Sequence, residues 1–171
     1  MLTSPFFVGC SLISPLWGLT LVVETMSLFL TCDAYIKTRM FSICRFKEIT
    51  GHYPTKITMV SFSFKRRRFE TLHAPALRWP ADQFLYVGVD PPASSGFDIE
   101  ASTKGELENA AKPFEKDPYG CHSEILQQKR HERNPYSRTP PYPLSCPEMA
   151  DLFKYCGPEF FPSNQLPWDK F

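Results

Sequence analysis

The chain of 171 residues lacks several features that would assign it to a common functional class. It has no excess of charge, since 19 Lys and Arg residues balance 18 Asp and Glu residues, so the composition does not favour a nucleic-acid-binding protein. It contains no Asn-X-Ser/Thr sequon and no Cys-X-X-Cys pair. The sequence therefore carries no glycosylation signal, zinc knuckle or thioredoxin-like redox motif.

The cysteines are widely spaced, which favours reduced thiols over a disulfide framework. They are Cys10, Cys32, Cys44, Cys121, Cys146 and Cys156. A chain of this length forms a core without covalent staples, so we predict a reducing, cytoplasmic compartment, although the even number of cysteines leaves a disulfide set open. A zinc site at Cys121 and His122 would need adjacent ligands, which rarely close a tetrahedron, so no metal site is predicted.

Residues 1–36 contain no Lys or Arg, and the run from Phe6 to Val23 is uncharged and mostly apolar. A membrane helix needs about 20 apolar residues, and Pro15 interrupts this run. A secretory signal would begin with a basic region, which is absent here. We therefore predict an apolar N-terminal segment at 1–36 and a domain at 37–171, with a membrane anchor at 6–23 as the less favoured alternative.

The next two segments indicate one helix and one strand. Residues 37–51 have apolar side chains at helical spacing, and Gly51 with Pro54 ends the helix. The run at 56–62 lacks polar alternation, which is typical of a strand covered on both faces, and residues 84–89 predict a second buried strand. This order predicts an α/β fold, namely an incomplete Rossmann-like αβα sandwich with a mostly parallel sheet, and a proline-rich C-terminal region of short helices.

Two capping boxes predict helix starts in the second half. They are Thr103-X-X-Glu106 and Ser145-X-X-Glu148. The aromatic C-terminal tail, which includes Trp168, is expected to fold back onto the sheet.

The junction after residue 62 is the predicted functional site. Strand ends and helix N-termini of parallel α/β proteins converge where ligands bind, and here four cations, Lys65 to Arg68, follow the strand. Lys65 and Arg68 are three residues apart and therefore share a helix face. We predict an anion site for phosphate or carboxylate, formed by Ser61, Ser63, Lys65, Arg68 and Asp90.

Two other interpretations of the cations remain open. Each cation near a helix N-terminus costs about 0.3–1 kcal/mol, so acidic partners are expected nearby. The run would then be a solvated basic helix paired with Glu70, Asp82 or other acids, and Asp90 would offset the charges of Lys65 and Arg68. A Lys-Arg run is also typical of nuclear import signals, a pattern that is common by chance.

Residues Phe41 to Glu70 resemble the middle of the domain-of-unknown-function 218 family, the YdcF-like domains, in its fungal branch. The family motif close to V-T-S-x-F-H-x-x-R lies on Val60 to Arg68, where Arg68 matches and Lys65 replaces the family His. The resemblance continues at 78–80, 87–94 and 166–168. The family's Gly-Gly loop and Asp-Ser-x-x-Glu-Asn stretch are missing.

This resemblance implies a Rossmann-like domain of unknown biochemical role, and S-adenosylmethionine is reported as a ligand of one bacterial member. The expected function is binding of a small anionic or adenosyl ligand at the junction. Because Lys65 removes the neutral proton shuttle at that position, we do not expect an enzyme. An enzyme acting on a nucleotide or phosphorylated metabolite, and a protein-interaction module, are the alternatives. Missing early strands would leave the sheet uncovered, so self-association is also predicted.

Overall fold

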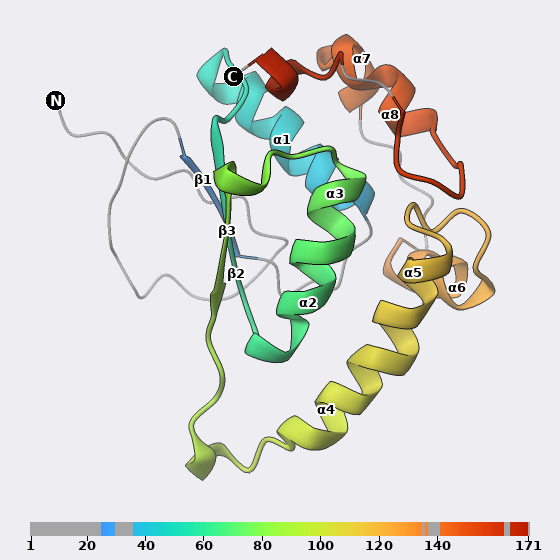
Figure 1. Ribbon diagram of the computed structural model, residues 1–171. Helices are drawn as coiled ribbons and strands as arrows, with labels where there is room; N and C mark the ends of the chain where they lie inside the picture. Colours follow the sequence, from blue (N-terminus) through green and yellow to red (C-terminus); the bar gives the residue numbers. More distant parts are fainter. Residues whose placement is uncertain (1–24, 30–35, 135, 137–140, 163–164, 171) are drawn as a thin grey trace, which may run out of the picture.

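The computed structural model describes residues 25–29, 36–134, 136, 141–162 and 165–170, and within these ranges the chain is a mixed α/β protein (Figure 1). The apolar run at 6–23 lies outside the described residues, so neither its structure nor the predicted anchor is addressed. In the described part of the chain, no helix has the length and apolar character needed to span a membrane.

The sheet has three parallel strands in the order β1–β2–β3, which are Thr25–Phe29, Lys56–Ser61 and Phe84–Gly88. The register aligns Met59 of β2 with Leu28 of β1 and with Tyr86 of β3. The positions of β2 and β3 and their parallel pairing confirm the prediction. Strand β1 comes from the predicted N-terminal segment, so residues 25–29 belong to the same sheet as the rest of the chain.

The helices occupy the segments between and after the strands. Helix α1 is Ile36–Thr50, and Gly51 ends it with φ +83°, as the sequence predicts. One continuous helix then joins α2 (Arg66–Arg68), the π-helical turn Phe69–His73 and α3 (Ala74–Ala76), and another joins α4 (Ile99–Glu106), the π-helical turn Leu107–Ala111 and α5 (Lys112–Lys116). The short C-terminal helices are α6 (Glu124–Arg133), α7 (Tyr142–Ser145) and α8 (Ala150–Lys154). Short 3₁₀ turns are Ser63–Lys65, Ala81–Gln83, Ala93–Ser95, Pro147–Met149 and Pro167–Lys170.

The labelled helices lie on one side of the sheet in Figure 1. Met59 and Tyr86 are buried, whereas the alternate residues Leu85, Val87 and Val89 are 46%, 38% and 56% exposed. The prediction that β3 is a buried strand is therefore wrong for one of its two faces, which is exposed. Within the described ranges we find no second helical layer, so the αβα sandwich stays a prediction.

The aromatic C-terminal tail packs into the core, as predicted. Trp168 is fully buried, and its indole N–H donates to the Leu77 carbonyl at 3.0 Å. Its ring centroid lies 4.8 Å from that of Trp79. The 3₁₀ turn Pro167–Lys170 therefore packs against the end of the helix that contains α2 and α3.

The two predicted capping boxes are both wrong. Helix α4 begins earlier, where the Asp98 carboxylate accepts the Ala101 N–H at 2.8 Å, so Thr103 lies inside the helix. Ser145 ends α7 rather than capping a helix. The acid of the second box, Glu148, instead accepts bonds from the α1 side of the core, from Lys47 Nζ and from the Tyr53 hydroxyl, each at 2.9 Å.

Cys121 and Cys156 form a disulfide, with their Cα atoms 5.7 Å apart. The prediction of reduced thiols is wrong for this pair, because the fold brings the loop before α6 beside the segment after α8. Cys44 and Cys146 are free and buried. Cys121, the cysteine of the rejected zinc site, is thus bonded to Cys156, and the described residues hold no group of three or more His, Cys, Asp or Glu side chains suited to a metal.

Candidate ligand-binding site

Three of the predicted site residues lie at the ends of β2 and β3. The Ser63 N–H donates to Asp90 Oδ1 at 2.8 Å, and the Ser61 carbonyl accepts the Val89 N–H at 2.8 Å. The residue that precedes the 3₁₀ turn is Phe62, so Ser63 is the first residue of that turn. Asp90 thus stabilises the strand-to-helix turn by accepting a backbone N–H of that turn. The carboxylate that makes this bond is the one predicted to contact a ligand or to offset the charge of a cation.

The cations of the 65–68 run point to different partners. Arg66 Nη1 lies 3.0 Å from Glu70 Oε1 and donates to the Tyr86 carbonyl at 2.9 Å. Arg67 pairs with Glu115 of α5. These contacts confirm that acidic groups offset the charges at this helix start, Glu70 among them.

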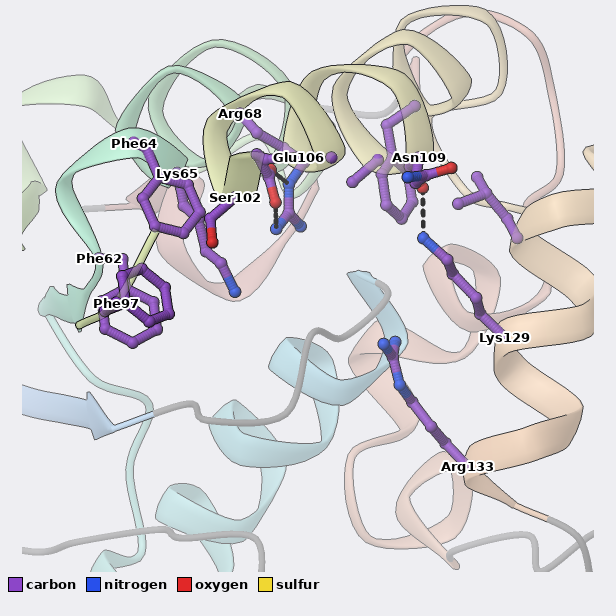
Figure 2. Close-up of a pocket in the computed structure, with 14 residues that line it drawn as sticks. Phe62, Phe64, Lys65, Arg68, Phe97, Ser102, Glu106, Asn109, Lys129 and Arg133 are labelled. Carbon is purple, nitrogen blue, oxygen red and sulfur yellow. Dashed lines mark hydrogen bonds and ion pairs between the residues drawn. The ribbon is translucent and has the colours of Figure 1, made fainter. Parts of the chain in front are cut away.

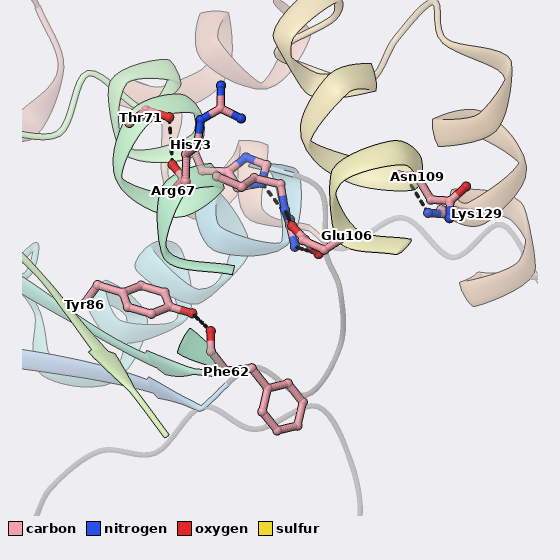
Figure 3. A network of polar contacts seen from close by, with 9 residues as sticks. Phe62, Arg67, Thr71, His73, Tyr86, Glu106, Asn109 and Lys129 are labelled. Carbon is pink, nitrogen blue, oxygen red and sulfur yellow. Dashed lines mark hydrogen bonds and ion pairs between the residues drawn. The ribbon is translucent and has the colours of Figure 1, made fainter. Parts of the chain in front are cut away.

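Arg68 is buried inside a network of polar side chains. Its Nε and Nη2 donate to the two carboxylate oxygens of Glu106, and the side chains are 1% and 8% exposed. Its Nη1 lies 2.9 Å from His73 Nε2, because the π-helical turn places residues five apart on one face. Figure 3 shows His73 and Glu106 at this network, beside the bond from the Tyr86 hydroxyl to the Phe62 carbonyl.

His73 is neutral in this network. Burial lowers its pKa well below the usual value, and the nearby charges of Arg39 and Arg68 lower it further. Since a guanidinium can only donate, the Nε2 atom of His73 accepts from Arg68. The buried partners of the Arg68 guanidinium therefore include one carboxylate and one neutral imidazole.

A cavity of about 350 Å³ opens beside this network. Its walls come from the turn after β2, from the helix of α4 and from α6 (Figure 2). Lys65 and Arg133 project into the same space from different walls, and Lys129 Nζ donates to the Asn109 carbonyl at 2.5 Å. The volume is within the range of small-molecule sites, about 300–1,000 Å³.

Three phenylalanine rings form one wall of the cavity (Figure 2). The Phe62 centroid lies 5.4 Å from that of Phe64 and 5.5 Å from that of Phe97, with interplanar angles of 11° and 23°. The ammonium of Lys65 lies 5.6 Å from the Phe62 centroid. The wall thus presents aromatic faces beside a positive charge.

The described lining of the cavity is positively charged. Its cations are Lys65, Arg68, Lys129 and Arg133, and Glu106 is the one acidic residue among the described residues that line it. Glu106 is paired with Arg68, and the other three cations come from the turn after β2 and from α6. Cations gathered around one cavity are the groups that bind anions in proteins.

The structure divides the predicted site. Lys65 and Arg68 both line the cavity, whereas Ser61, Ser63 and Asp90 form the neighbouring strand-end turn and are not among its lining residues. Sequence reasoning did not include Phe97, Lys129 or Arg133 in the predicted site. No local pattern marks these residues, because they reach the cavity only through tertiary packing.

Comparison with known proteins gives one informative match. The chain is 36% identical over 109 residues to Uncharacterized protein YOR238W of Saccharomyces cerevisiae. The match covers 60% of this chain and 36% of the yeast protein, so the chain spans little more than a third of that relative's length. No protein-family model matches the chain. No solved structure matches it either. The chain is therefore similar to an uncharacterised yeast protein.

Proposed function

We propose that this chain binds a small anionic ligand in the cavity beside the β2–α2 junction. The observation that carries this proposal is the position of Lys65, Lys129 and Arg133, which line one cavity from the turn after β2 and from α6. Arg68 then supports the wall instead of contacting the ligand.

The aromatic wall adds a preference for a ligand that carries a planar ring. Ring faces stack on nucleobases in a sequence-tolerant way, worth about 1–3 kcal/mol per base. Positive charge beside such a wall favours a nucleoside phosphate. It disfavours S-adenosylmethionine, because the sulfonium gives that molecule a net positive charge. We therefore place nucleotides ahead of the adenosyl sulfonium that the family resemblance implies.

The YdcF-like relationship and the Rossmann-like sandwich are part of the same proposal. The parallel order of β2 and β3 and the strand-to-helix turn with its cations support them. Ligands of open parallel sheets bind at the carboxyl ends of the strands, and the cavity lies next to the end of β2.

Isothermal titration calorimetry with ADP, inorganic phosphate and S-adenosylmethionine tests the proposal. We expect ADP to bind most tightly, because it alone combines a ring with several negative charges. Removing one cation by Lys65→Ala or Arg133→Ala is expected to weaken ADP binding by about tenfold, which corresponds to 1.4 kcal/mol.

Arg67→Ala is the matched control for these variants. It removes a cation from the same run, but Arg67 pairs with Glu115 and is not among the described lining residues. Equal losses for Lys65→Ala and Arg67→Ala would contradict the proposed site. Failure of all three ligands to bind would contradict the proposed function.

Catalysis on a bound nucleotide or phosphorylated metabolite stays a prediction. The buried imidazole of His73 is 1% exposed and contacts Arg68, so it has no direct path for a proton into the cavity. An assay of phosphate release from ADP or ATP in the presence of the protein tests this alternative. Release of phosphate would favour the enzyme.

A further inference from the structure

Three sulfur atoms meet in the core between α1 and the C-terminal segment. Cys44 Sγ lies 3.5 Å from Met149 Sδ, and burial together with the nearby Cys146 raises the pKa of the Cys44 thiol. All three residues are fully buried. Two distant parts of the chain therefore bring two thiols and one thioether to one point.

Local structure holds two of the sulfur ligands close together. Cys146 follows α7 directly, and the 3₁₀ turn Pro147–Met149 begins there, with the Met149 N–H donating to the Cys146 carbonyl at 3.0 Å. Helix α1 packs against α7, where the rings of Phe41 and Tyr142 lie 5.3 Å apart, and supplies Cys44. The spacing Cys-Pro-Glu-Met thus places its first and last side chains toward the same helix.

Polar groups lie next to the sulfur atoms. The Tyr53 hydroxyl lies near Cys146 and donates to Glu148 at 2.9 Å. Lys47 Nζ lies 3.3 Å from the same hydroxyl. Burial raises the pKa of the Cys44 thiol, so this thiol keeps its proton until an ion displaces it.

We propose that Cys44, Cys146 and Met149 form a binding site for a soft monovalent metal ion, Cu(I). Thiolate and thioether donors select Cu(I) over the harder divalent ions, which prefer oxygen and imidazole. Binding replaces the proton of at least one thiol by a sulfur–copper bond and releases that proton to solvent. The copper stays Cu(I), so no oxidant or reductant takes part. This site is separate from the cavity of the proposed function.

Anaerobic titration of the full chain with the Cu(I)–bicinchoninate complex tests the site. We expect the protein to remove Cu(I) from the chelator and to unfold at a higher temperature when loaded, because the ion binds the folded state. Cys44→Ser is expected to weaken binding by more than about 100-fold, since even groups that only support metal ligands change affinity by about 10–100-fold.

Met149→Leu tests the site without a large change in core volume, because Met and Leu are close in size. We expect at least about tenfold weaker binding from it, and unchanged binding from Met59→Leu, which alters a buried methionine elsewhere in the core. Wild-type affinity in both Cys44→Ser and Met149→Leu would overturn the site, as would no uptake of Cu(I) by the wild type.

A second control separates the site from the two cysteines of the disulfide. The double variant Cys121→Ala/Cys156→Ala removes the disulfide sulfurs and is expected to bind Cu(I) as the wild type does. Loss of binding in this variant, with Cys44 and Cys146 intact and the protein folded, would assign the copper to the disulfide cysteines and overturn the proposal.

Discussion

At the residue scale, the buried charge of Arg68 depends on one carboxylate. The Arg68 side chain is 1% exposed, and Glu106 contacts it through both oxygens. Breaking a buried ion pair by removing one partner leaves an uncompensated charge. Within the run of four cations, Arg68 therefore makes a buried link between the helix of α2 and the helix of α4, and Arg67 makes an exposed link to the same helix through Glu115.

We expect Glu106→Ala to lower the free energy of unfolding by about 3–5 kcal/mol, as measured by urea denaturation. Glu115→Ala is the control, because it breaks the exposed pair with Arg67, whose side chains are 62% and 37% exposed. That change is expected to cost less than about 1 kcal/mol. Similar losses in both variants would show that Arg68 does not need its carboxylate.

His73 makes the stability depend on pH. Its pKa is lowered in the folded state by burial, whereas the unfolded side chain titrates near its usual value of about 6.5. The unfolded chain then binds more protons below that pH, so stability falls as the pH is lowered through about 6.5. The slope from this one group reaches about 1.4 kcal/mol per pH unit.

Urea denaturation at several pH values between about 7.5 and 5 measures this slope, because the interval includes the usual histidine pKa of about 6.5. We expect His73→Gln to flatten the pH dependence, because the variant has no imidazole to protonate. His131→Gln, which changes an exposed side chain, is expected to keep the wild-type profile. An unchanged profile in His73→Gln would mean that another group causes the pH dependence.

At the element scale, the end of β3 and the turn after β2 approach each other closely at Gly88. A Cβ added to Gly88 would lie 2.4 Å from Ser63 Oγ and 3.0 Å from Ser63 Cα. The same turn is held by the bond between Ser63 and Asp90. The absence of a side chain at Gly88 therefore sets the spacing between β3 and the start of the α2 helix.

Gly88→Ala is expected to lower the free energy of unfolding by about 1–3 kcal/mol, because the backbone of the turn must shift. Gly105→Ala provides the comparison, since it lies in α4 with its nearest neighbouring atom 3.9 Å from the added Cβ. That variant is expected to gain about 0.5–1 kcal/mol from helix propensity. Thermal unfolding followed by circular dichroism measures both, and a stable Gly88→Ala protein would refute the close contact.

At the scale of the whole molecule, the Cys121–Cys156 disulfide links the loop before α6 to the segment after α8 across 35 residues. Asp117 stabilises the same loop by accepting the N–H groups of Cys121, His122 and Ser123. Burial raises the pKa of Asp117, and these three bonds outweigh burial, so the pKa is lowered overall. The loop is thus held by covalent and polar contacts together.

Replacing the disulfide by Cys121→Ser/Cys156→Ser is expected to lower the free energy of unfolding by about 3–4 kcal/mol, because the unfolded chain gains entropy. Adding dithiothreitol to the wild type should produce a similar loss in urea denaturation. If the wild type has the same stability with and without reductant, and both thiols react with a labelling reagent, the disulfide does not form in solution. Labelling of protein taken directly from cells also tests the predicted cytoplasmic compartment.

Self-association of the whole chain stays a prediction. It was inferred from an uncovered sheet, and the exposed side chains of Leu85, Val87 and Val89 are consistent with that inference. Sedimentation at several protein concentrations would test it.

Local sequence determined the elements around the junction. Helical spacing followed by Gly51 specified α1, and apolar runs without polar alternation specified β2 and β3, because these signals depend only on residues close in the chain. The same local signals located the turn after β2, whereas Asp90 reaches this turn through the parallel pairing of β2 with β3. It also predicted that acids would accompany the cations of that turn.

Tertiary structure decided everything that depends on partners distant in sequence. Glu106 became the partner of Arg68 at a helix that Asp98 caps, and Glu148 paired with Lys47. Both carboxylates are thus held by cations from distant parts of the chain. The cavity forms only when α6 packs over the junction, and the disulfide forms only when two loops distant in sequence come together. Residue spacing along the chain does not predict such contacts, because they follow from how whole helices pack.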